Sequence, residues 1–167
     1  MYLVSEGIEI YDIVSDGQAD TVLQLIEQAR VDGPVLVINS DVMLVSSNAL
    51  QGFLQSVESV GTAESAALVF PQDDAKAYSF VSEAGWFTKA AEKRRISSFA
   101  MVGVYWFADA KELARRLRTV VQSAKAEPFL SEVFSLFQKN WAVTVPVGAV
   151  AEFGTPEKLR ATIERFK

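Results

Sequence analysis

Short apolar runs alternate along this chain with segments of helical periodicity, and this alternation limits the fold more than any other feature. Residues 35–38, Val-Leu-Val-Ile, form an apolar run typical of a strand buried on both faces of a parallel sheet. A helical segment at 19–29 precedes this run, and a helical segment at 48–60 and a second apolar run at 65–70 follow it. This order predicts an α/β fold of three layers, in which helices cover a mostly parallel sheet.

The remaining segments add strands and helices to this pattern. Residues 7–14 alternate apolar and polar side chains, which predicts an edge or half-buried strand. A glycine-bearing turn at 82–85 separates strand-like runs at 78–81 and 86–90 and predicts an added β-hairpin. Further strands are predicted at 99–107 and 142–147, and further helices at 108–126, 129–137 and 155–166. We expect residues 1–167 to form one domain, as is usual for this length.

The composition excludes several kinds of chemistry. The sequence contains no cysteine and no histidine. Disulfides, thiolate zinc sites and imidazole bases are therefore excluded, and any metal must bind to oxygen ligands, which favours hard cations such as Mg²⁺. A net charge of -5 disfavours a nucleic-acid partner, and the one dense basic run, Lys93-Arg94-Arg95, is more often a solvated bend than a polyanion site. The sequence has no apolar run that could span a membrane and no signal peptide, so we expect a cytoplasmic protein.

Two carboxylates stand out because of where they lie along the chain. Asp41 follows the apolar run 35–38, and ligands of open α/β sheets collect at the carboxyl ends of strands. An aspartate in this position is also a common turn former or helix cap. Glu152 lies in an otherwise apolar stretch, so it needs a partner or a cation if it is buried. The two carboxylates could share one divalent cation if the fold brings them together.

Two further segments are candidates for binding an anion. Glu92-Lys93 ends the predicted hairpin, where Lys93 could offer its charge to a phosphate, although a surface ion pair explains the same residues. Gln18 opens a helix, and the free backbone N–H groups of a helix start favour anions. Asp16 could instead serve as the N-cap of that helix.

Four stretches occur in an order that is similar to a known family. They are residues 17–23 (Gly-Gln-Ala-Asp-Thr-Val-Leu), 34–41 ending in Asp41, 92–107 beginning with Glu92-Lys93, and 152–157 (Glu-Phe-Gly-Thr-Pro-Glu). Together they resemble the sugar-phosphate nucleotidyltransferases, the NDP-sugar pyrophosphorylase-like proteins with a glycosyltransferase-A-like fold, and in particular their bacterial polysaccharide-precursor branch. The resemblance extends over nearly the whole chain.

The resemblance implies a role for each matched residue. Asp41 and Glu152 would hold Mg²⁺, although Glu152 stands where the family more often has aspartate. Lys93 would bind the phosphate of the sugar, and Asp41 and Lys93 would be the catalytic residues.

Three other matched residues would contact the rest of the substrate. Gln18 would lie near the nucleotide base, and Glu92 would bind sugar hydroxyls. Gly103 would let the sugar approach the backbone.

The sequence departs from the family at its start. The family opens with a strand and a Gly-rich loop that cradles the triphosphate, and neither is present. The resemblance therefore implies a domain for the reaction of a sugar 1-phosphate with a nucleoside triphosphate, with catalysis by this chain alone left uncertain. The alternative is a non-catalytic subunit that binds a sugar phosphate or nucleotide.

The missing strands would also leave the apolar run 35–38 at an open edge of the sheet. We therefore expect a homodimer, or a partner chain that covers this edge. A third way to cover it is pairing with the segment 8–14 of the same chain.

Overall fold

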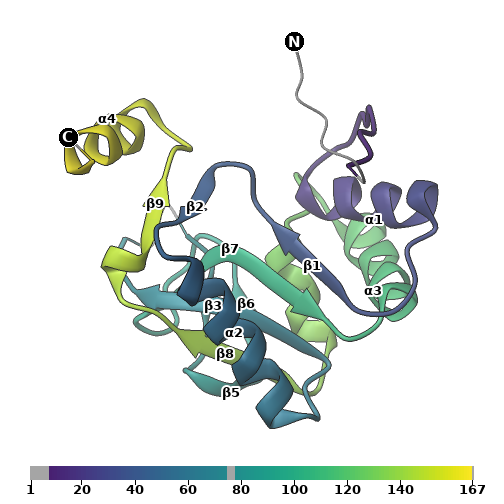
Figure 1. Cartoon of the computed structure of the whole chain (residues 1–167). Helices are drawn as coiled ribbons and strands as arrows, with labels where there is room; N and C mark the ends of the chain where they lie inside the picture. Colours follow the sequence, from purple (N-terminus) through teal and green to yellow (C-terminus); the bar gives the residue numbers. More distant parts are fainter. Residues whose placement is uncertain (1–7, 75–77, 167) are drawn as a thin grey trace.

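A seven-stranded sheet forms the centre of the molecule in the computed structural model, which describes residues 8–74 and 78–166 (Figure 1). The strands run in the order β5-β8-β3-β7-β4-β6, and β1 also pairs with β7. Their bounds are β1 Val35–Ile38, β3 Ser65–Pro71, β4 Phe80–Val81, β5 Gly85–Phe87, β6 Ala90–Ala91, β7 Phe99–Phe107 and β8 Asn140–Thr144.

The sheet is mixed in its pairing. β1, β3 and β4 are antiparallel to β7, and β8 is parallel to β3, so β1, β3, β4 and β8 all run in one direction. The common direction of β1, β3 and β8 is what the βαβ pattern predicts. Because β7 lies between β1 and β3, these two strands are parallel but are not neighbours. Among the described strands, the neighbours that are parallel are β3 and β8. The predicted α/β fold, with helices over a central sheet, is confirmed.

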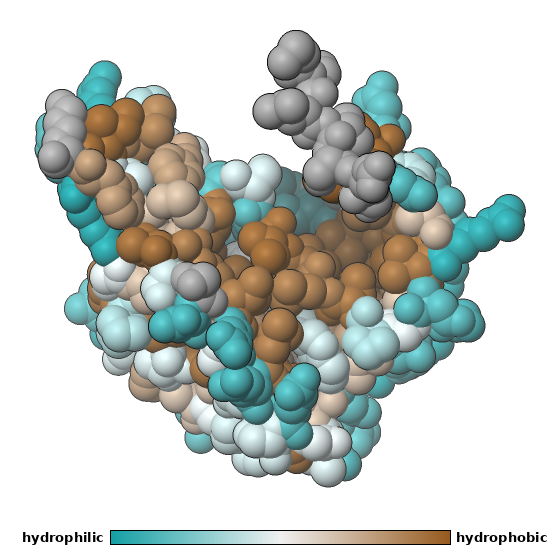
Figure 2. Space-filling model, viewed as in Figure 1, coloured by the Kyte–Doolittle hydropathy of each residue, from teal (hydrophilic) through white to brown (hydrophobic). Residues whose placement is uncertain are grey.

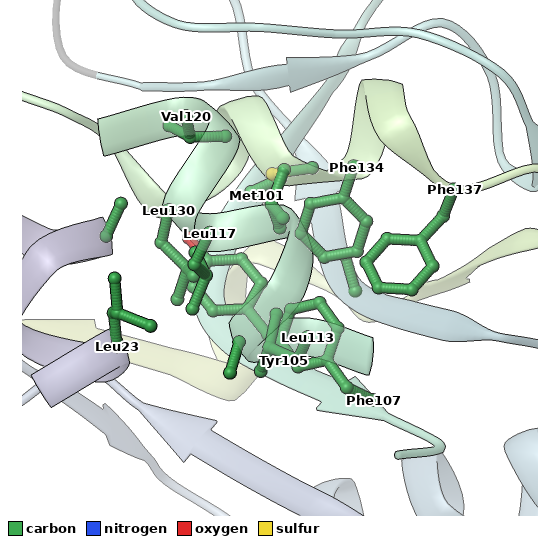
Figure 3. Close-up of a cluster of buried hydrophobic side chains, with 14 of the residues drawn as sticks. Leu23, Met101, Tyr105, Phe107, Leu113, Leu117, Val120, Leu130, Phe134 and Phe137 are labelled. Atoms are coloured by element: carbon green, nitrogen blue, oxygen red, sulfur yellow. The ribbon is translucent and has the colours of Figure 1, made fainter. Parts of the chain in front are cut away.

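Helices cover both faces of the sheet. On one face lie α1 (Gln18–Ala29), α3 (Ala110–Ser123) and the short 3₁₀ segment η1 (Leu130–Leu136), and on the other lies α2 (Ser47–Val60). Successive residues of β7 point to opposite faces, so Met101 and Tyr105 join the first core and Val102 and Val104 the second. Figure 3 shows the first core, where the aromatic rings of η1 and β7 meet the aliphatic side chains of α3.

A small second sheet stands apart from the large one. It pairs β2 (Val42–Leu44) with β9 (Val150–Glu152), and a 3₁₀ turn, η2 (Val147–Ala149), leads into it. The last helix, α4 (Pro156–Arg165), follows β9 and packs against it. Its N-cap is Thr155, whose side chain accepts a hydrogen bond from the amide of Lys158, and Pro156 occupies its first turn as predicted. The sequence analysis did not predict β2 or β9, whose three residues each are too few to show a period.

Two predictions about strands are corrected by the structure. Residues 8–14 form no strand, because no strand of the described residues pairs with them, and Ile8, Ile10 and Val14 are exposed. Gly7, the first residue of that predicted strand, lies outside the described residues. The predicted hairpin pairs β4 with β6 rather than with β5. β5 crosses to the far edge of the sheet and pairs with β8, where Trp86 packs edge-on against Trp141.

The other elements keep their predicted type and shift by a few residues. The helix predicted at 108–126 runs from Ala110 to Ser123, because Asp109 caps it by accepting a hydrogen bond from the amide of Glu112. The helix predicted at 129–137 is the 3₁₀ segment η1, and the strand predicted at 142–147 is β8. No helix within the described residues is long and apolar enough to cross a membrane.

Candidate functional site

One pocket of about 480 Å³ opens where the carboxyl end of β1 meets β7, β9 and the start of α1. Six residues that the sequence singled out all line it, although they come from distant parts of the chain. They are Gln18, Asp41, Glu92, Lys93, Gly103 and Glu152. The fold thus brings every predicted site residue to one pocket, which is the arrangement that a shared ligand requires.

Two glycines allow polar side chains to lie against the backbone in this pocket. Gly103 has a φ of 90°, and a Cβ built there would lie 2.8 Å from Nδ2 of Asn39. Asn39 is held in place because its backbone N–H donates to the carbonyl of Gly103 at 2.8 Å. In the same way, a Cβ on Gly154 would lie within 2.4 Å of Oδ2 of Asp41. Larger residues at either glycine would therefore fill the space that these side chains use.

Glu152 is part of a cluster with Tyr78 and Lys158. The Lys158 ammonium donates to Oε1 of Glu152 at 2.9 Å, and the Tyr78 hydroxyl donates to Oε2. The same ammonium lies 4.2 Å from the centre of the Tyr78 ring. Burial and the hydrogen bond to Glu152 raise the pKa of Tyr78. Burial opposes the charge on Lys158, but its bonds to Tyr78 and Glu152 prevail and raise its pKa. The partner that a half-buried Glu152 needs is therefore Lys158.

Glu92 and Lys93 form the opposite wall of the pocket. The hydroxyls of Ser79 and Ser131 both donate to Oε2 of Glu92, which fixes the carboxylate. Lys93 has a left-handed backbone with φ 48°, and its amide donates to the carbonyl of Tyr78 at 3.1 Å. Its ammonium lies 4.7 Å from the centre of the Phe129 ring. In the described residues no carboxylate forms an ion pair with Lys93, so its charge is available to an anion.

The start of α1 is less open than the sequence suggested. Gln18 lines the pocket, but the amide of Ala19 donates to the carbonyl of Pro128 at 3.0 Å. A Cβ on Gly17 would lie 2.6 Å from Cγ of Glu127, so the chain at 127–128 packs directly on the helix start. The N-cap is Gly17, without a side-chain cap, so Asp16 does not cap this helix.

Sequence reasoning missed six polar residues of the pocket, namely Asn39, Tyr78, Ser79, Tyr105, Glu127 and Lys158. Asn39 lies beside Asp41 in the sequence, so its place could have been inferred from the end of β1. Lys158 lies in the first turn of α4, six residues after Glu152, in a segment that the sequence marked only as a helix start. No sequence signal pointed to Tyr78 or Glu127, since only the packing of loops brings them here.

As the side chains lie, a cation shared by Asp41 and Glu152 does not fit well. Both carboxylate oxygens of Glu152 already accept hydrogen bonds. Val42 is the residue opposite Glu152 in the β2–β9 pair, so Asp41 is offset from it by one position. Within the described residues, no three acidic side chains gather into a metal-binding group. A divalent ion at Glu152 would have to displace the ammonium of Lys158.

Comparison with known proteins identifies the fold. No known family profile matches the sequence, and no curated protein is significantly similar to it. Solved structures do match. The nucleoside-diphosphate-sugar pyrophosphorylase from Vibrio cholerae RC9 aligns with a TM-score of 0.71 at 18% identity, over 92% of this chain and 67% of that protein. The chain has the fold of the NDP-sugar pyrophosphorylases.

Two further structures with this fold give the same result. A UDP-glucose pyrophosphorylase from Acinetobacter baumannii aligns with a TM-score of 0.73 at 15% identity, over 98% of this chain and 61% of that protein. A UDP-glucose pyrophosphorylase complexed with UDP-glucose gives a TM-score of 0.72 at 14% identity, over 92% of this chain and 63% of that protein. This chain therefore spans about two thirds of the length of the pyrophosphorylases that it matches. The fold implied by the sequence resemblance is confirmed.

Proposed function

We propose that this chain is a nucleotidyltransferase-like domain of bacterial sugar-nucleotide or polysaccharide-precursor metabolism, and that its pocket binds a sugar phosphate or an NDP-sugar. One observation carries the proposal. The six residues matched to the nucleotidyltransferases all line one pocket, in a fold shared with NDP-sugar pyrophosphorylases. The corresponding reaction is attack by a sugar 1-phosphate on the α-phosphate of a nucleoside triphosphate, with release of pyrophosphate. Because nucleoside triphosphates are metabolites of the cytoplasm, the proposal also places the protein there.

Each residue has a chemical task in this proposal. Lys93 offers an unpaired ammonium to the sugar phosphate, and Glu92 is held ready to accept hydrogen bonds from sugar hydroxyls. Gly103 leaves space at β7 that the side chain of Asn39 occupies, and a sugar ring would lie beside it; Gln18 lies at the edge where a base would enter. Asp41 is an exposed carboxylate of the pocket, as is Glu127.

The alternative function is non-catalytic binding, either as a sugar-phosphate-binding protein or as a regulatory subunit. It is favoured by the charge of the pocket, whose described lining holds the carboxylates of Asp41, Glu92, Glu127 and Glu152 but only two ammonium groups, on Lys93 and Lys158. One of these is already paired with Glu152. A triphosphate entering this pocket would meet more negative than positive charge, and nothing in the pocket is arranged to offset the charge of its transition state.

We expect the chain to bind glucose 1-phosphate or UDP-glucose in isothermal titration calorimetry without releasing pyrophosphate in a coupled assay. Lys93→Met should weaken binding by about tenfold, because a charged hydrogen bond to phosphate contributes about 1.5–3 kcal/mol. Lys89→Met, at an exposed site outside the pocket, should bind as the wild type does. No binding of any sugar phosphate or NDP-sugar would contradict the proposal. Pyrophosphate release by the chain alone would favour the enzyme over the alternative.

If the chain is an enzyme, Asp41 and Glu152 would bind a divalent cation. The ammonium of Lys158 should limit the affinity of these carboxylates for that cation. We expect Lys158→Met to bind Mg²⁺ about tenfold or more tightly than the wild type, because removing the ammonium frees a carboxylate oxygen for the metal. Lys158→Arg keeps the charge and should leave the Mg²⁺ affinity unchanged. Calorimetric titration with MgCl₂ measures both variants, and equal affinities for wild type and Lys158→Met would show that this carboxylate does not bind the metal.

A further inference from the structure

The outer edge of β1 has no neighbouring strand in the described part of the chain. β1 pairs with β7 on one side only, through Val35, Val37 and then Asn39, whose amide donates to the carbonyl of Gly103. In an antiparallel pair alternate residues bond to the same neighbour, so the N–H and C=O groups of Leu36 and Ile38 face the other way. They form an open strand edge of the kind that pairs readily with another chain.

Apolar side chains surround this edge. Figure 2 shows them gathered on the floor of a hollow, over β1 and β2, between α1 on one side and the β9–α4 segment on the other. A cavity of about 560 Å³ lies beside β1, and its apolar lining includes Val22, Leu25, Val37, Ile38 and Leu130. Ile38 keeps 47% of its surface exposed and Leu25 keeps 38%. Because walls stand on both sides of the hollow, a slender extended segment fits it better than a broad surface does.

The same chain contains a segment with the pattern of a strand but with no partner. Ile8, Ile10 and Val14 occupy even positions, which together with Asp12 would share one face of a strand, but residues 8–14 form no strand in the structure. Ile8 is 55% exposed, Ile10 71% and Val14 91%. These three side chains thus keep more than half of their surface exposed, although they would share one face of a strand.

Hydrogen bonds to α1 fix the end of this segment. The side-chain amide of Gln24 donates to the carbonyl of Val14 at 3.0 Å, and the hydroxyls of Ser15 and Thr21 are hydrogen-bonded to each other. Only Asp16 and Gly17 separate Ser15 from the first residue of α1. Among the described residues, each copy therefore carries both a strand-like segment and a strand edge without a strand partner, and the two do not pair with each other.

We propose that two copies exchange these segments, so that residues 8–14 of each copy pair with the free edge of β1 in the other. A reciprocal exchange of this kind gives a closed two-fold dimer and leaves neither segment unpaired. It would bury Ile10 and Ile38 together on the floor of the hollow. The proposal concerns a surface beside the pocket and does not depend on the proposed function.

Sedimentation velocity at micromolar concentration tests the proposal on the full chain. The wild type should sediment as a dimer of twice 18.3 kDa. Ile10→Lys changes the exchanged segment, and Ile38→Pro changes the edge of β1 that receives it. Each substitution should weaken self-association by at least tenfold, because a charged side chain or a proline prevents strand pairing at an edge. Val147→Lys is the matched control, since the 54% exposure of Val147 lies between those of Ile38 and Ile10 but the residue is on η2, so this variant should dimerise as the wild type does. A wild-type monomer, or a dimer that neither variant weakens, would overturn the proposal.

Cross-linking identifies which segments meet. Since the chain has no cysteine, Ile10→Cys and Ile38→Cys each introduce a unique thiol. A short bismaleimide linker, which tolerates a small shift of register, should join the two variants into a covalent dimer when they are mixed, but should not join either variant to itself. The double variant should also give covalent dimers. A double variant that links only within one chain would show that residues 8–14 cover their own β1, and would overturn the exchange.

Discussion

Phe134→Ala is expected to lower the free energy of unfolding by about 3–5 kcal/mol, the range for removing a buried aromatic ring from a core. Phe134 is fully buried on η1 and packs against three other rings. Its ring centre lies 5.7 Å from Phe87, 5.7 Å from Tyr105 and 5.4 Å from Phe107 (Figure 3). Since these rings lie on β5 and β7, the cavity would loosen the packing of η1 on the sheet. Urea unfolding followed by tryptophan fluorescence measures the loss.

Phe166→Ala provides the matched control for this substitution. Phe166 is 51% exposed at the end of α4, so its removal should change the free energy of unfolding by less than about 0.5 kcal/mol. Equal losses for the two variants would contradict the account of the core. Phe134→Ala should also weaken ligand binding, because Tyr105 packs on Phe134 and lines the pocket. Burial raises the pKa of Tyr105, so its hydroxyl stays protonated and remains available as a donor.

Gly103→Val is expected to cost about 2–5 kcal/mol of stability and to abolish sugar-phosphate binding, because it combines backbone strain with overpacking. The φ of 90° at Gly103 lies in a region that β-branched residues avoid. The new Cβ would also lie 3.0 Å from Cβ of Asn39, so the Asn39 side chain would have to leave the pocket. Chemical unfolding and calorimetric titration with glucose 1-phosphate measure the two effects separately.

Gly52→Ala separates this local effect from the general effect of replacing a glycine. Gly52 lies within α2, and a Cβ there would meet nothing within 4 Å. The substitution should stabilise the protein by about 0.4–1 kcal/mol, because alanine favours helix and limits the unfolded chain. A Gly103→Val variant that keeps wild-type stability and binding would mean that neither the strain nor the contact with Asn39 matters.

Local sequence patterns predict some features of the candidate site but not others. Asp41 could be placed at the edge of the sheet because it directly follows β1, and Glu152 could be singled out because a charge in an apolar stretch needs a partner. The identity of that partner could not be read from the sequence. Lys158 reaches Glu152 because α4 turns back over β9, and Tyr78 reaches it from a loop far away in the chain. The tertiary structure therefore decides whether Glu152 binds a metal ion or an ammonium group.

The alternation of apolar runs and helical segments determined which residues form α1, β1, α2, β3, β7 and α3, because burial on one helical face leaves a local period and burial of a strand leaves a short apolar run. Only the tertiary structure decided which strands became neighbours. β7 lies between β1 and β3 and makes the sheet mixed, while β5 leaves the expected hairpin for β8. Residues 8–14 have the period of a strand but remain unpaired, since a strand also needs a neighbour whose backbone groups are free. Such pairing depends on contacts between distant segments, and those contacts leave no period in the sequence.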